Sequence, residues 1–223
     1  MRLFERLVIL VLFPVNFLST VGAIIAGIWL IVIGEWKLVL VSFFGTTLSS
    51  MLIGFALLPQ FAIAVPARYF AKRHNQILTY FFAALSQLYA AALIVIWSAS
   101  VLYYFAPTNT LHSFSTTAPY LFWAYGVAVS PWTYLVIQDS GDNDLQAPMF
   151  SYAPLFSLFL QIGLLAAILV IIMLDASPIV GGYVILGAMI IALCVIIPLT
   201  GNKMLVAGVY QALDEKIHLL SHK

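Results

Sequence analysis

Residues 155–174 read LFSLFLQIGLLAAILVIIML and residues 179–198 read IVGGYVILGAMIIALCVIIP, with only the turn DASP, residues 175–178, between them. A helix rises about 1.5 Å per residue, so each run is long enough to cross a hydrocarbon core of roughly 30 Å. The short turn makes the two helices antiparallel neighbours. The tight turn Gly34-Glu35-Trp36-Lys37 predicts the same for the apolar runs on either side of it. Both runs are continuously apolar, and they lack the alternation that is typical of membrane-barrel strands.

The composition of the whole chain agrees with this pair of helices. Of 223 residues, 64% are hydrophobic and 8% are charged, and the mean hydropathy is +1.09. Soluble proteins carry roughly 25% charged residues, and so little polar material does not cover the surface of a soluble fold. The net charge of +1 gives no reason to expect a nucleic-acid partner. The chain is therefore expected to have the lipid bilayer as its surroundings.

The charged residues fall into clusters separated by six charge-free apolar runs. These runs cover residues 7–33, 38–58, 77–105, 119–137, 155–174 and 178–198. Val21-Gly22-Ala23 resembles a signal-peptide cleavage site, but the apolar run continues to Ile33, so we expect an uncleaved first helix. The sequence predicts a single all-α membrane domain over 1–223, a bundle of six transmembrane helices.

The basic residues predict the orientation of the bundle. With the N-terminus inside, the inner segments are 1–6, 59–76, 138–154 and 199–223, and they hold eight of the nine Lys and Arg residues. Cytoplasmic segments of membrane proteins are enriched in these residues. We therefore expect both termini to be cytoplasmic. The single Cys194 and the lack of a glycosylation sequon agree with a bacterial-type plasma membrane.

The six runs contain no Asp, Glu, Lys, Arg or His. Such residues inside a membrane mark proton relays, ion sites and voltage sensors, and acid–base or metal catalysis depends on them. His218 and His222 are four residues apart near the C-terminus, but two ligands without a third make a poor zinc site. We expect no enzyme, no cofactor and no metal.

Uncharged polar residues recur at one depth in five of the six runs, about 3–6 Å to the cytoplasmic side of the middle of each. Tyr125 and Trp132 lie deep in the aromatic-rich run 119–137. One interpretation is a polar intramembrane site that opens to the cytoplasm and takes a neutral ligand. The other is a set of hydrogen bonds between helices. The candidate residues are Asn16, Ser50, Gln87, Tyr125, Ser130, Trp132 and Gln161.

Two further patterns indicate surfaces for packing. Ser19, Ala23 and Gly27 form a small-residue stripe, which predicts close packing within the monomer or, alternatively, a homo-oligomer or partner interface. Gly201 and Asn202 are typical of a helix end and a new cap, so a separate helix is predicted over 202–221. Apolar residues recur along it at helical spacing, which favours a helix lying on the inner membrane face, or one that docks a cytoplasmic partner. They are Val206, Tyr210, Leu213, Ile217 and Leu220.

Two classes of function agree with these features. The short loops, the ion-free interior and the amphipathic tail favour a non-catalytic structural or accessory subunit. The uncharged polar residues at one depth favour the alternative, a small uncoupled permease or channel for a neutral solute.

Overall fold

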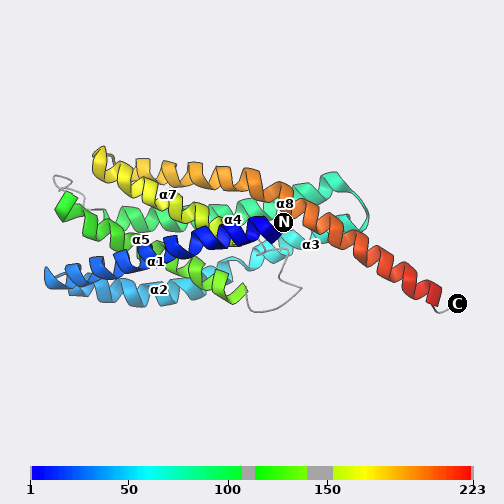
Figure 1. Ribbon diagram of the computed structural model, residues 1–223, viewed down its shortest axis with the longest axis horizontal. Coiled ribbons are helices and arrows are strands. Elements are labelled where there is room, and N and C mark those ends of the chain that lie inside the picture. The colour runs from blue at the N-terminus through cyan, green and yellow to red at the C-terminus, as the bar shows by residue number, and fades with distance from the viewer. Residues whose placement is uncertain (1, 107–113, 140–152, 222–223) are drawn as a thin grey trace.

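The computed structural model describes residues 2–106, 114–139 and 153–221, and every regular element within them is a helix. This confirms the all-α prediction. Figure 1 shows an elongated bundle, with one helix extending well beyond the others. The helices are α1 (Arg2–Val32), α2 (Trp36–Ala56), α3 (Leu58–Lys72), α4 (Gln76–Phe105), α5 (Phe114–Asp139), α7 (Ala153–Met173) and α8 (Pro178–Ser221).

Five helical stretches in this part of the chain are long and apolar enough to cross a membrane. They are Leu10–Val32, Trp36–Lys72, Gln76–Phe105, Pro154–Met173 and Pro178–Leu205. The sixth predicted run, 119–137, forms helix α5 but does not belong to this set. Its tyrosines, tryptophans and prolines are less hydrophobic than the aliphatic residues of the other helices. The count of six spans therefore stays a prediction.

Helix α5 nevertheless lies at the centre of the bundle. It packs against α1, α2, α4 and α7, and Leu121, Ala124 and Ala128 on it are fully buried. Its aromatic side chains bind the neighbouring helices through their polar ends, since the Trp123 indole N–H donates to Ser42 Oγ on α2 over 2.7 Å. A helix in this position has little contact with lipid and has less need of a strongly apolar surface.

The two tight turns of the sequence form as predicted. Gly34 ends α1 with a φ of +98°, a conformation that favours glycine, and the Glu35 N–H donates to the Leu30 carbonyl over 2.8 Å. Pro178 is the first residue of α8, and the Val180 N–H donates to the Ser177 carbonyl over 2.9 Å. Helices α1 and α2 pack together, as do α7 and α8.

The predicted inner segment over 59–76 is largely helical, and its place on the cytoplasmic side stays a prediction. The helix is interrupted at Leu57, where Pro59 begins the next turn, and α3 then continues to Lys72. At the break the Gln60 N–H donates to the Leu57 carbonyl over 2.9 Å. The Ala56 carbonyl accepts from the Tyr89 hydroxyl on α4 over 2.7 Å. A side chain from another helix thus satisfies a backbone group that the break exposes.

The prediction that Gly201 ends the last span is wrong, because α8 runs unbroken from Pro178 to Ser221. A Cβ atom at Gly201 would lie 2.2 Å from the Tyr80 ring on α4, and the Tyr80 hydroxyl donates to Asn202 Oδ1. Gly201 therefore allows close packing, and Asn202 binds a neighbouring helix instead of capping a new one. The side chains from Val206 onward lie outside the described residues, so the amphipathic pattern stays a prediction.

Replacing Gly201 tests this packing contact. Gly201→Ala should lower the free energy of unfolding by about 1–3 kcal/mol, because the added methyl group overpacks against Tyr80. Gly187→Ala on the same helix meets no atom within 4 Å and should be neutral, or stabilise by up to about 1 kcal/mol. Unfolding in detergent, followed by circular dichroism, measures both. Equal effects of the two substitutions would contradict the assignment.

Candidate functional site

The amide of Gln161 is the centre of a buried polar network. Gln161 lies on α7 and is fully buried. Its Oε1 accepts from the Tyr125 hydroxyl on α5 over 3.1 Å, and its Nε2 donates to Ser157 Oγ over 3.2 Å. The same Nε2 donates to Asn16 Oδ1 on α1. Three helices distant in sequence thus meet at one amide group.

We call the four side chains the Gln161 network: Asn16, Tyr125, Ser157 and Gln161. Asn16, Tyr125 and Gln161 are among the residues that the sequence indicates, and the structure brings them together. Sequence reasoning missed Ser157 as a polar partner. Ser157 precedes Gln161 by four residues on one helix face, a spacing that indicates such a pair.

The remaining candidate residues lie outside the network. Ser50 is half-buried and donates to the Thr46 carbonyl of its own helix over 2.7 Å. Ser130 was expected to line the interior, but it is exposed, and its hydroxyl donates to the Val127 carbonyl over 3.3 Å. Counting residues gives the depth of Ser130 but not the side of the helix on which it lies. A serine bonded to its own backbone faces lipid at little cost.

Gln87 and Trp132 are buried but have no partner in the described part of the chain. Gln87 on α4 is 1% exposed, and neither its Oε1 nor its Nε2 makes a hydrogen bond. The Trp132 indole N–H is likewise unpartnered. Gln60, Ser86, Ser98 and Thr200 add further buried polar atoms without partners. The polar residues predicted at one depth therefore include a hydrogen-bonded group around Gln161 and others without hydrogen-bond partners, such as Gln87.

The small-residue stripe of α1 packs within the chain. A Cβ atom at Gly27 would lie 2.5 Å from the Trp123 ring, and one at Gly126 would lie 2.7 Å from the Ala23 Cβ. Both contacts join α1 to α5, so the stripe has an intramolecular neighbour. On α7, a Cβ at Gly163 would lie 2.8 Å from the Ala188 Cβ of α8. Small residues allow these pairs of helices to approach closely.

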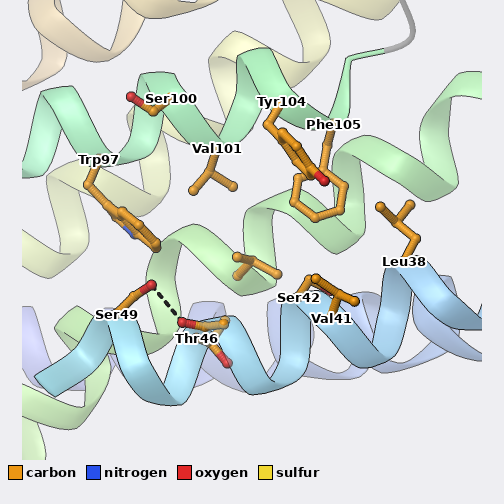
Figure 2. A pocket seen from close by; sticks show the side chains of 12 residues that line it. Leu38, Val41, Ser42, Thr46, Ser49, Trp97, Ser100, Val101, Tyr104 and Phe105 are labelled. Carbon is orange, nitrogen blue, oxygen red and sulfur yellow. Dashed lines mark hydrogen bonds between the residues drawn. The ribbon is translucent and has the colours of Figure 1, made fainter. Parts of the chain in front are cut away.

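A groove of about 340 Å³ runs between α2 and α4, with α5 at its back. Figure 2 shows Ser49 and Thr46 of α2 facing Trp97 and Val101 of α4 across it. Its serine and threonine hydroxyl groups donate to carbonyl groups of their own helices, as Ser49 Oγ does to the Gly45 carbonyl over 2.6 Å. The lining residues are Leu38, Val41, Ser42, Gly45, Thr46, Ser49, Trp97, Ser100, Val101, Tyr104, Phe105 and Val127.

A second, mostly apolar hollow of about 770 Å³ lies between the end of α4 and the start of α8, where Tyr103, Tyr104 and Tyr183 line it. Neither this hollow nor the groove includes Gln87 or Gln161. Within residues 2–106, 114–139 and 153–221, no three His, Cys, Asp or Glu side chains gather as a metal-binding set.

A double-mutant cycle measures the strength of the Gln161 network. Tyr125→Phe and Gln161→Leu should show a coupling energy of about 0.6–1.7 kcal/mol, because the two side chains share a hydrogen bond inside the bundle. Ser130→Ala, on the same helix as Tyr125, should show no coupling with Gln161→Leu, because Ser130 is exposed and bonded to its own helix. Chemical unfolding in detergent gives these energies. The absence of coupling between Tyr125 and Gln161 would contradict the network.

The chain was also compared with known proteins, and no family model, no curated protein and no solved structure matches it. The Gln161 network and the unpartnered Gln87 are the features of the described residues that bear most directly on a function.

Proposed function

We propose that this chain is a six-span, non-catalytic membrane protein that serves as a structural or accessory subunit. The observation that carries the proposal is the Gln161 network, in which amide and hydroxyl groups of α1, α5 and α7 bond to one another. Both heteroatoms of the Gln161 amide have a partner within the chain. Such bonds stabilise one arrangement of helices. They favour a structural role for these residues over a substrate-binding one.

The chemistry of the helix interiors supports a non-catalytic role. The six apolar runs contain no Asp, Glu, Lys, Arg or His, and their ionisable groups are tyrosine hydroxyls and the single thiol of Cys194. Amides do not ionise and hydroxyl groups stay protonated near neutral pH, so they are poor general acids and bases there. Cys194 is exposed on α8. A membrane scaffold needs none of these catalytic groups.

The distribution of basic residues supports a cytoplasmic location for both termini. Helix α1 begins at Arg2, α3 ends at Lys72 and α8 continues past Lys203. These three segments lie toward the same end of the bundle in Figure 1, whereas Lys37 follows the turn at the opposite end. By the positive-inside rule the first end faces the cytoplasm of a bacterial-type plasma membrane.

Labelling of single cysteines tests this orientation. In a Cys194→Ser background, Ser177→Cys in the turn before α8 should react with a membrane-impermeant maleimide on intact cells, because that turn faces outward. Gln76→Cys at the start of α4 should react only after the cells are permeabilised. Both native side chains are exposed, so accessibility within the fold is matched. The reverse pattern would overturn the proposed orientation.

The C-terminal part of α8 is the surface that we assign to a cytoplasmic partner or to the membrane face. It extends well beyond the rest of the bundle in Figure 1. The small-residue stripe on α1 is less suited to a homo-oligomer interface, because α5 of the same chain packs against it. A projecting amphipathic helix agrees with an accessory role, since its apolar face has a bilayer or a partner helix to cover it.

Paired substitutions on this helix test the accessory role. Leu213→Asp and Ile217→Asp, on the predicted apolar face, should abolish co-purification of partner proteins in mild detergent. Gln211→Asp and His218→Asp, on the predicted polar face, should leave co-purification unchanged although they add the same carboxylate groups. Mass spectrometry of the purified samples gives the readout, and the thermal midpoint of each variant checks folding. A native sample without any partner would contradict an accessory subunit.

A small uncoupled permease for a neutral solute is the second candidate function, and the unpartnered amide of Gln87 favours it. The same purified protein separates the two functions when it is placed in liposomes. A permease admits glycerol faster than protein-free liposomes do, whereas an accessory subunit leaves the rate unchanged.

A further inference from the structure

The buried core of the described helices contains two apolar clusters. The larger one includes Leu57 and Ala90, and the smaller one includes Ala64 and Ala83. Between these residues along α3 and α4, the buried positions are polar. They are Gln60, Ser86 and Gln87, each at most 1% exposed. We call these three side chains the Gln87 cluster.

Two contacts of α4 place the Gln87 cluster along the chain. Nearer the α3–α4 turn, the rings of Phe70 on α3 and Phe82 on α4 stack with their centroids 5.8 Å apart. Farther from the turn, the Tyr89 hydroxyl donates to the carbonyl of Ala56, the last residue of α2, over 2.7 Å. Gln60 follows Ala56 by four residues and Gln87 precedes Tyr89 by two, so along the chain both lie within about 6 Å of this second contact.

The Gln87 cluster contains four buried polar atoms without a hydrogen-bond partner. They are Gln60 Oε1, Ser86 Oγ, Gln87 Oε1 and Gln87 Nε2. Each loses its contact with bulk water on folding, and a buried polar atom left without a partner is destabilising. Several residues about one helical turn away are alanines, which add no polar group to partner these atoms. They are Ala56, Ala64, Ala83, Ala90 and Ala91.

The unpartnered atoms define the chemistry of the molecule that satisfies them. Gln87 Nε2 is a donor and needs an acceptor, which a metal cation does not provide. Gln60 Oε1 and Gln87 Oε1 are acceptors and need donors, which an anion does not provide. A neutral molecule that both donates and accepts fits all four atoms. Buried water does so, with about three hydrogen bonds per molecule, and so does a small amide- or hydroxyl-bearing solute.

We propose that the Gln87 cluster is a binding site for a small uncharged molecule of this donor–acceptor class, either water or an amide- or hydroxyl-bearing solute. The site is distinct from the Gln161 network, whose amide is already bonded within the chain. It does not depend on the accessory role, because a bound molecule in the cluster satisfies the fold whether or not a solute crosses the membrane.

Radiolytic labelling of introduced cysteines tests the site in the full-length protein. X-rays generate hydroxyl radicals from water, and a buried thiol is oxidised quickly only where water lies beside it. In a Cys194→Ser background, Ser86→Cys should be oxidised several-fold faster than Ala83→Cys or Ala91→Cys. All three native side chains are on α4 and are at most 3% exposed. Ala83 is nearer the start of the helix than Ser86 is. Equal slow oxidation of the three would show a cluster without water, and together with no effect of acetamide, the solute probe described below, it would overturn the proposal.

Two additions distinguish the occupant and guard against local unfolding. Gln87→Leu in the Ser86→Cys chain should slow the oxidation, because half of the unpartnered atoms are lost; an unchanged rate, with the thermal midpoint retained, would overturn the site. Acetamide serves as the solute probe. If it raises the thermal midpoint of the native chain and protects Ser86→Cys, an amide occupies the cluster. If it changes neither, while Ser86→Cys still oxidises fastest, the occupant is water. Liposome flux is a separate measurement, so failure of this site and failure of the accessory role are distinguishable.

Discussion

The hydrogen bonds of the Gln161 amide connect three helices, α1, α5 and α7, in the interior of the bundle. Lipid chains are as apolar as leucine side chains, so hydrophobic burial does not select one neighbour over another inside a bilayer. Directional bonds and close backbone contacts make that selection. The bonds from Gln161 to Tyr125 and Asn16 join α7 to α5 and α1. The position of α5 at the centre of the bundle agrees with this connection.

Close contacts at glycine determine the remaining neighbours. Gly27 lies against Trp123, Gly163 against Ala188, and Gly201 against Tyr80. Each contact brings two helix backbones together and increases the dispersion attraction along their length. Asn202, the residue after Gly201, accepts a hydrogen bond from the Tyr80 hydroxyl. Small residues and polar residues therefore act together at the helix pairs that define the bundle.

Much of the fold can be predicted from the sequence, because the positions of charged residues and the lengths of the apolar runs can be counted along the chain. The apolar runs predict the helices, and Gly34 and Pro178 predict the turns beside them. The sequence does not reveal on which side of a helix a residue lies. For this reason the depth predicted for Ser130 gives no information about its exposure. Asn16, Tyr125 and Gln161 do meet, since each lies on a face that points inward.

Glycine and proline are a second case in which the sequence alone does not determine the local structure. Gly201 has the signature of a helix end, yet its function in the fold is to accept the Tyr80 ring. Pro59 interrupts the chain, yet the following residues continue as α3, because α4 packs along them. Both residues permit more than one local structure. The choice depends on a partner that lies far away in the sequence.

The unbroken course of α8 has a mechanical consequence. Its 44 residues trace about 66 Å along the helix, well over the thickness of the hydrocarbon core. Pro198 lies inside this helix, and an interior proline removes one backbone hydrogen bond and is a point at which a helix bends. The direction of the projecting end therefore depends on the angle at Pro198 as well as on the packing of the first half against α4 and α7. The length of the projecting part would convert a slight change of that angle into a displacement of several ångströms beyond the membrane surface.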